Sequence, residues 1–99
     1  MHVISRKKLV EFYSQAGRHD AKGQLEAWYH EAKHAQWASS ADVKAQYRSA
    51  SILGDNRVVF NIAGNKYRLV VKINYSSKTV FVRFIDTHKE YDKVDAEAI

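Results

Sequence analysis

The sequence predicts an α+β domain in which two N-terminal helices pack on one face of an antiparallel-rich, mostly meandering sheet. Three observations support this. Apolar residues recur with helical spacing over residues 6–37. From residue 58 onward they alternate with the period of a β-strand. The chain has 99 residues, of which 45% are hydrophobic, so we expect one core and a single domain over residues 1–99.

The chain opens with a predicted short strand and a helix. Residues 2–4 resemble a strand, and Ser5 follows as a residue suited to capping a helix. Gly17 suits the position just after a helix, so the first helix is predicted over residues 6–16. Its apolar face has spacing i, i+3, i+4 and i+7: Leu9, Phe12, Tyr13 and Ala16.

A second helix is expected after Asp20, whose carboxylate is suited to cap it. A shorter helical turn is expected from Asp42 to Tyr47. The apolar stripe of the second helix comprises Leu25, Trp28, Tyr29, Ala32 and Gln36, with Trp37 near its end.

The C-terminal part predicts three strands, over residues 58–62, 67–75 and 79–86. Gly64 and Asn65 suit the positive-φ positions of the first hairpin. We expect Leu69, Val71 and Ile73 to face the helices, and Arg68, Lys72, Asn74 and Arg83 to face solvent. In the last strand, strict alternation groups Val80, Val82 and Phe84 on one face and Phe81, Arg83 and Ile85 on the other.

Charge and composition favour a polyanionic partner. The net charge is +5, and residues 57–93 carry eight Lys or Arg against three acidic residues. A solvated surface with scattered lysines is the alternative. The chain has no cysteine, no signal-like start and no stretch of about 18 apolar residues, so we expect a cytoplasmic protein.

One motif suggests zinc, but its position argues against a metal. Residues 30–34 match HExxH, the helical pattern of zinc peptidases. At about 100° per residue, His30 and His34 lie opposite the apolar stripe, and Lys33 adds a cation beside them. We therefore predict a solvated helix face, with neither metal nor other cofactor.

Residues 87–92 follow the last strand and carry acid, base and cationic side chains. Cleaving RNA without a metal requires proton transfer and stabilisation of charge on phosphorus. The candidate catalytic residues are Arg68, Arg83, His88 and Tyr91. Candidate RNA-binding residues are Lys72, Asn74, Lys89, Glu90 and Asp92.

Structural roles remain open for three of these residues. Arg83 could pair with a carboxylate on the sheet, His88 could cap the strand end, and Tyr91 could belong to the core. Glu90 is a second possible base, and Asp92 could orient His88 or Lys89.

The chain resembles the HigB branch of the RelE-type toxin superfamily. The resemblance is strongest over residues 58–94 and extends loosely to the N-terminal strand and helices. It rests on Phe60-Asn61-Ile62, Gly64-Asn65, Tyr67-Arg68-Leu69-Val70, Val82-Arg83 and Thr87-His88-Lys89-Glu90-Tyr91-Asp92.

This resemblance implies a RelE-like small sandwich and an mRNA interferase, a toxin that cuts mRNA on the ribosome. It also implies a cognate HigA-like antitoxin with a helix-turn-helix. The arginine of the superfamily's penultimate strand maps to Arg68, its C-terminal tyrosine to Tyr91, and its basic residue after the last strand to His88 or Lys89. The alternatives are a non-catalytic gyrase inhibitor resembling ParE-like toxins and a plain RNA-binding module.

Overall fold

The computed structural model describes residues 1–99. Its strands are β1 (His2–Ile4), β2 (Ser51–Ile52), β3 (Arg57–Ile62), β4 (Tyr67–Asn74) and β5 (Thr79–Thr87). Its helices are α1 (Arg6–Tyr13), α2 (Lys22–His34), α3 (Ser40–Gln46) and α4 (His88–Tyr91), with a 3₁₀ turn, η1 (His19–Ala21), before α2.

The five strands form one mixed sheet in the order β1-β5-β4-β3-β2. Strands β2 to β5 follow one another as an antiparallel meander, whereas β1 lies parallel to β5 at the edge. A parallel pair needs a crossover connection, which here contains α1 and α2. The predicted α+β class and the meander are therefore present in the structure.

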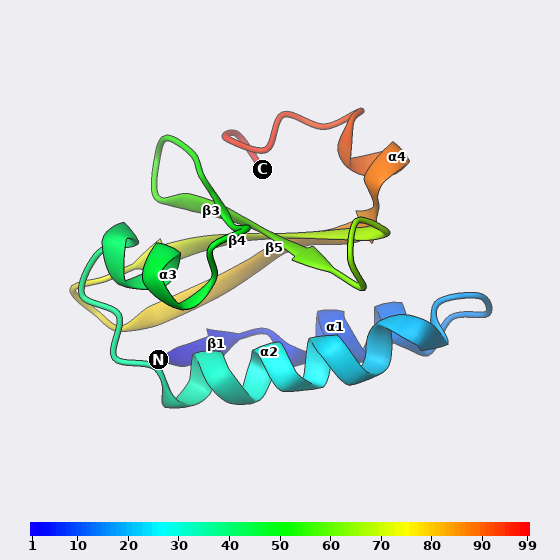
Figure 1. The fold of residues 1–99 in the computed structure, drawn as a ribbon, viewed down its shortest axis with the longest axis horizontal. Coiled ribbons are helices and arrows are strands. Elements are labelled where there is room, and N and C mark those ends of the chain that lie inside the picture. Colours follow the sequence, from blue (N-terminus) through cyan, green and yellow to red (C-terminus); the bar gives the residue numbers. More distant parts are fainter.

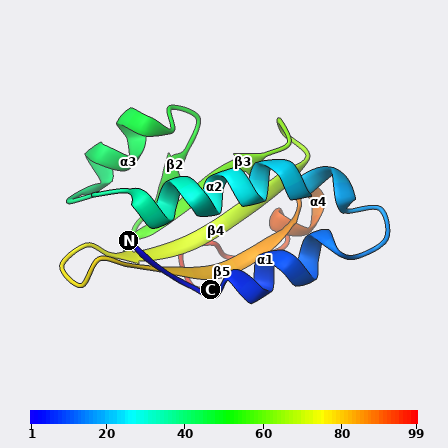
Figure 2. The same ribbon diagram turned by 90° about the horizontal axis from the view of Figure 1, so that it is seen from below.

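Helices α1 and α2 lie together on one face of the sheet (Figures 1 and 2). The core between these layers includes Leu25 and Trp28 from α2, and Leu69, Val71 and Ile73 from β4, all buried. Each large apolar side chain buried in this way contributes about 1.5–3 kcal/mol. The alternating apolar residues of β4 thus determine which face of the sheet the helices cover.

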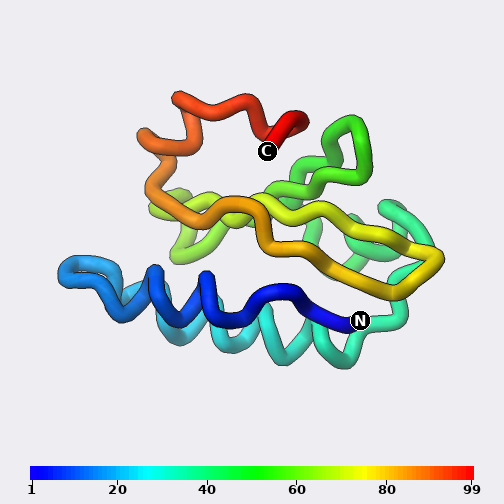
Figure 3. The backbone as a smooth tube through the Cα atoms, turned by 180° about the vertical axis from the view of Figure 1, so that it is seen from behind, coloured from blue at the N-terminus to red at the C-terminus, as the bar shows by residue number.

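The C-terminal segment covers part of the opposite face (Figures 1 and 3). Ala96 packs there on Val59 and Val70 in a second, smaller apolar cluster. The buried Arg57 guanidinium donates two hydrogen bonds, of 3.0 and 2.6 Å, to the Ile99 main-chain oxygen. Asn74 and Arg83 are exposed as expected, whereas Arg68 and Lys72 are only partly exposed. Val59 and Val70 give this face an apolar centre that the C-terminal segment covers.

A β-bulge interrupts β5 and changes the faces of its second half. Val71 pairs with Val82, but Val70 pairs with Phe84, so Arg83 is the extra residue. Beyond the bulge, Ile85 packs against the helix-side core and Phe84 against the opposite cluster. The predicted faces of Phe84 and Ile85 are therefore exchanged.

Helix and turn boundaries differ from the prediction in several places. Helix α1 ends at Tyr13 rather than Ala16, and α2 ends at His34. Asp20 lies in η1 and does not cap α2, because its carboxylate bonds elsewhere. In the β3–β4 turn, the positive-φ residues are Ala63 and Gly64, not Asn65.

Helix α4 and strand β2 were not predicted. None of the four helices combines the length and the apolar character needed to span a bilayer.

Candidate functional site

The β3–β4 turn holds Arg68 and His88 at the same end of the sheet. Arg68 donates from Nη1 to the main-chain oxygens of Asn65 (3.0 Å) and Tyr67 (3.3 Å). The main-chain N–H of His88 donates to the oxygen of Lys66 at 3.1 Å. Both residues are therefore fixed to two adjacent turn residues, although 20 positions separate them in the sequence.

A threonine cap starts α4 immediately after β5. The Thr87 hydroxyl accepts from the main-chain N–H of Glu90 at 3.2 Å, as expected of an N-cap. One turn further on, Asp92 Oδ2 lies 3.1 Å from His88 Nδ1, and both side chains are half-exposed. This contact orients the imidazole and leaves Nε2 available to another group.

Tyr91 is the last residue of α4 and packs partly against the sheet. Its ring centroid is 6.4 Å from that of Phe84, and the side chain is half-buried. The Tyr91 hydroxyl makes no hydrogen bond in the structure. Glu90 instead pairs with Lys93 at 3.1 Å, and Lys89 is exposed.

Asp20 anchors this end of the sheet to the helix layer. Its carboxylate accepts from the buried Tyr67 hydroxyl and from Lys66 Nζ, each at 2.5 Å. The hydrogen bonds from Lys66 and Tyr67 lower the pKa of Asp20, and the bond to Asp20 raises the pKa of Lys66. Burial and then Asp20 raise the pKa of Tyr67. The group thus ties η1 to the turn that holds Arg68 and His88.

Three predicted site residues lie elsewhere. Arg83 sits on the bulge with its guanidinium 5.4 Å from the Phe81 ring centroid, and lines a hollow beside α1. Lys72 pairs across strands with Arg57 and Phe81. Asn74 lies six residues after Arg68 on β4, which is a distance of about 20 Å because a strand rises about 3.3 Å per residue. Its Oδ1 accepts hydrogen bonds from the Ser76 hydroxyl and the Ser77 main-chain N–H. The structure does not bring these three to His88.

The HExxH segment lies on the exposed side of α2. His30 and His34 stack edge to face with centroids 4.6 Å apart, and both are exposed. The Glu31 carboxylate accepts a hydrogen bond from the Tyr47 hydroxyl. No group of three or more His, Asp or Glu side chains is arranged to hold a metal ion.

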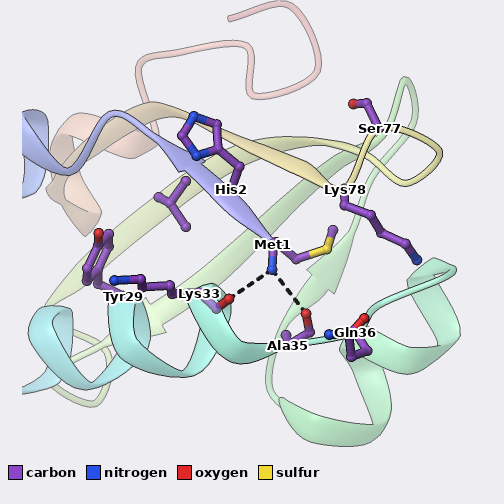
Figure 4. A pocket seen from close by; sticks show the side chains of 9 residues that line it. Met1, His2, Tyr29, Lys33, Ala35, Gln36, Ser77 and Lys78 are labelled. Carbon is purple, nitrogen blue, oxygen red and sulfur yellow. Dashed lines mark hydrogen bonds between the residues drawn. The ribbon is translucent and has the colours of Figure 1, made fainter.

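The largest hollow, of 570 Å³, lies at the opposite end of the sheet (Figure 4). Its lining includes Tyr29 and Lys33 from α2 and Lys78 from the β4–β5 turn. The Met1 nitrogen donates to the main-chain oxygens of Lys33 and Ala35, at 3.0 Å each. This hollow contains lysines but neither a carboxylate nor any of the candidate site residues.

Sequence reasoning missed two residues that build the site, Thr87 and Asp20. Thr87 and Glu90 form a Thr-x-x-Glu pattern, a signal for a helix start that was available in the sequence. Asp20 gave no such signal, because its partner Tyr67 lies 47 positions away.

Residues 21–94 match the model of the HigB toxin family, described as the RelE-like toxic component of a toxin–antitoxin system. The chain belongs to this family. It is also 30% identical over 94 residues to the mRNA interferase toxin HigB of Escherichia coli strain K12. The alignment covers 93% of this chain and 88% of that protein. The mRNA interferases HigB of Escherichia coli O157:H7 and Shigella flexneri match with the same identity and coverage. The resemblance drawn from the sequence is thereby confirmed.

Proposed function

We propose that this HigB family member is a metal-independent endoribonuclease that cleaves mRNA and so arrests translation and growth. The observation that carries the proposal is the joint attachment of Arg68 and His88 to the Asn65–Lys66 turn. It brings a guanidinium and an imidazole to one end of the sheet, which supports binding and cleavage of a phosphodiester there. The relatives named mRNA interferases support the same activity.

The reaction requires one bond to form and one to break. The ribose 2′-oxygen attacks phosphorus, the bond from phosphorus to the 5′-oxygen breaks, and a 2′,3′-cyclic phosphate and a 5′-hydroxyl result. His88 is suited to one of the two proton transfers, because an imidazole titrates near pH 6.5 in the absence of perturbation. The free N–H groups of Arg68 are suited to the non-bridging phosphate oxygens, since a guanidinium binds phosphate in a bidentate manner.

Tyr91 is the partner we assign to His88. Its hydroxyl is free, and it lies three residues after His88 on α4, so it can transfer the second proton or stack on a base. Lys89, Glu90 and Asp92 complete the polar surface around them, with Asp92 orienting His88. We assign Arg83, Lys72 and Asn74 to contacts further along the RNA strand rather than to the bond that breaks.

The family also suggests a fold, a partner protein and a substrate. We propose a RelE-like sandwich as the fold, a HigA-like antitoxin with a helix-turn-helix as the partner, and translated mRNA on the ribosome as the cytoplasmic substrate. The description of the family as the RelE-like toxic component of a toxin–antitoxin system supports a RelE-like fold and an antitoxin partner. Comparing cleavage of one message with and without translating ribosomes tests the third.

Expression without an antitoxin tests the activity itself. We expect growth arrest and mRNA fragments that end in 2′,3′-cyclic or 3′-phosphate. Arg68→Ala and His88→Ala should each relieve the arrest at equal protein levels. Intact messages during arrest, together with DNA damage, would indicate a gyrase inhibitor. RNA binding without arrest would indicate a binding module.

A further inference from the structure

Residues 95–99, which we call the C-terminal strap, lie across the sheet face opposite the helices (Figure 3). The main-chain N–H groups of Ala98 and Ile99 donate to the Asp95 oxygen at 3.0 and 3.2 Å, so the strap is a compact turn. Its Ala96 is buried in the smaller apolar cluster on that face. The strap is therefore packed against the sheet and has a defined position.

Arg57 attaches the strap to the sheet. It is the only charged side chain buried in the protein, with 6% of the residue exposed. Its Nε and Nη2 atoms donate to the Ile99 main-chain oxygen at 3.0 and 2.6 Å, and Nη1 donates to the Asp55 carboxylate at 2.6 Å. A buried guanidinium is stable only where such partners replace water. The Ile99 oxygen thus joins the strap to the start of β3.

The turn between β2 and β3 contacts the strap at a second point. Asp55 and Asn56 both have positive φ, 54° and 60°, as in a two-residue hairpin loop. Glu97 of the strap lies against Gly54 of the same turn, where a Cβ atom would come within 3.2 Å of Glu97 Oε2. The turn therefore positions the strap as well as the Arg57 partner Asp55.

The strap continues directly from Tyr91. Only residues 92–94 separate the two, and the Val94 main-chain N–H donates to the Tyr91 oxygen at 3.1 Å. The Tyr91 ring packs against the same apolar cluster as Ala96, and its centroid is 6.4 Å from that of Phe84. The strap therefore constrains both the main chain and the ring of Tyr91.

This packing places Tyr91 on the sheet face that carries Arg68. Arg68 and Val70 are two residues apart on β4, so their side chains share a face. Val70 pairs with Phe84, and Arg68 pairs with Asp86. Two residues of a strand span about 7 Å, so the ring on Phe84 lies one step along the sheet from Arg68.

We propose that Arg57 is a positioning residue, which holds the Tyr91 phenol on the face of Arg68 by fixing the strap to the sheet. The proposal rests on the proposed ribonuclease function, in which Tyr91 transfers a proton or stacks on a base. All three nitrogen atoms of Arg57 donate within the protein, so it acts through Tyr91 and not on RNA. Loss of these bonds releases the strap, whereas Arg68 and His88 keep their own bonds to the β3–β4 turn.

A double-mutant cycle of cleavage rates tests this coupling. Arg57→Met keeps a long side chain that fills the buried space but removes the bonds to Ile99. It should lower the rate of mRNA cleavage in a translating extract by about 10–10²-fold, within the cost of misplacing a group by about 1 Å. In a Tyr91→Ala background the same change should lower the rate by less than about twofold, because the group that Arg57 positions is already absent.

Two further variants separate positioning from stability. Arg57→Lys keeps a cationic donor and should recover part of the rate that Arg57→Met loses. Val43→Ala, which trims the core on the helix side of the sheet, is the matched control and should lower the rate by the same factor with and without Tyr91. An equal loss from Arg57→Met in both backgrounds would overturn the proposal, because Arg57 would then only stabilise the fold.

Amide hydrogen exchange addresses the strap without cleavage. In Arg57→Met, the amides of Val94, Ala98 and Ile99 should exchange about tenfold faster, while those of β4 stay protected. Unchanged protection of the three amides would overturn the attachment by Arg57. Faster exchange of these amides, together with no cleavage by the wild type, would instead overturn the ribonuclease function and leave the attachment standing.

Discussion

The two ends of the sheet have similar charge but different chemistry. At one end, the β3–β4 turn carries Lys66, accepts hydrogen bonds from Arg68 and His88, and is anchored by Asp20. At the other end, Lys33 and Lys78 line a hollow of 570 Å³, and the Lys78 ammonium donates to the Trp37 main-chain oxygen.

The difference is that only the first end pairs its imidazole with a carboxylate, with 3.1 Å between His88 Nδ1 and Asp92 Oδ2. His88 and Tyr91 lie there together on the single turn of α4. The larger hollow has an imidazole, His2, and a phenol, Tyr29, on separate elements, with lysines but neither an arginine nor a carboxylate. The larger volume is thus not the better candidate for cleavage of a polymer. A phosphodiester needs a cation and an acid–base pair at one exposed point, and it does not need to be enclosed.

Removal of the imidazole is the most severe test of this comparison. His88→Ala should lower the rate of mRNA cleavage in a translating extract by about 10²–10⁴-fold, the usual contribution of an acid–base group. His30→Ala, which removes an exposed imidazole from α2, serves as the control. A similar loss in both variants would remove the distinction between the regions.

Removal of the guanidinium should have the next largest effect. Arg68→Ala should lower the same rate by about 10²–10³-fold, as for loss of one donor to transition-state charge. Arg68→Lys should restore part of the rate, because it keeps the charge and loses the bidentate geometry. Arg48→Ala, at an exposed position after α3, is the control. Full activity of Arg68→Ala would show that phosphate binds elsewhere.

The hydrogen bonds of Asp20 to Lys66 and Tyr67 should make the stability of the protein depend on pH. Because the pKa of Asp20 is lowered on folding, its stabilisation is present above the ordinary value of 3.8 and is lost as the pH falls through the lowered value. Because the pKa of Lys66 is raised on folding, the stabilisation that Lys66 contributes is present below pH 10.5. It is lost as the pH rises through the raised value.

The unfolding temperature of Asp20→Asn should therefore be below that of the wild type between about pH 5 and pH 9. The gap should narrow toward both extremes. Glu11→Gln removes an exposed carboxylate paired with Lys7 at 3.7 Å and provides the reference. A gap that stays constant down to pH 2 would show that the Asp20 charge is not responsible.

Substitution at the opposite end should have the smallest effect. The double variant Lys33→Ala and Lys78→Ala should change the cleavage rate less than about threefold at physiological salt, because exposed charges are screened beyond about 8 Å. Measuring it beside Arg68→Ala, in the same extract, compares the two ends directly. A loss comparable to that of Arg68→Ala would mean that RNA follows the whole length of the sheet.

Local patterns predicted much of the architecture. Helical spacing identified Leu9 and Phe12, and in α2 Leu25, Trp28 and Ala32, but it wrongly added Gln36, which is exposed beyond the end of the helix. Alternation correctly directed Leu69, Val71 and Ile73 toward the helices. The bulge at Arg83 escaped this reasoning, since a period of two does not reveal where an extra residue is inserted. Two partners of the candidate site, Asp20 and Thr87, escaped it as well, whereas the contact between Asp92 and His88 was among the roles that the sequence left open.

The sequence by itself determined the class of fold, the family and the side chains available for chemistry, because these depend on residue type and short-range spacing. Only the tertiary structure decided which of those side chains meet. It joined Asp20 to Tyr67, attached His88 to the turn before Arg68, and separated Arg83 and Asn74 from both. Strand register and the bulge set these distances, and both result from packing between segments far apart in the chain.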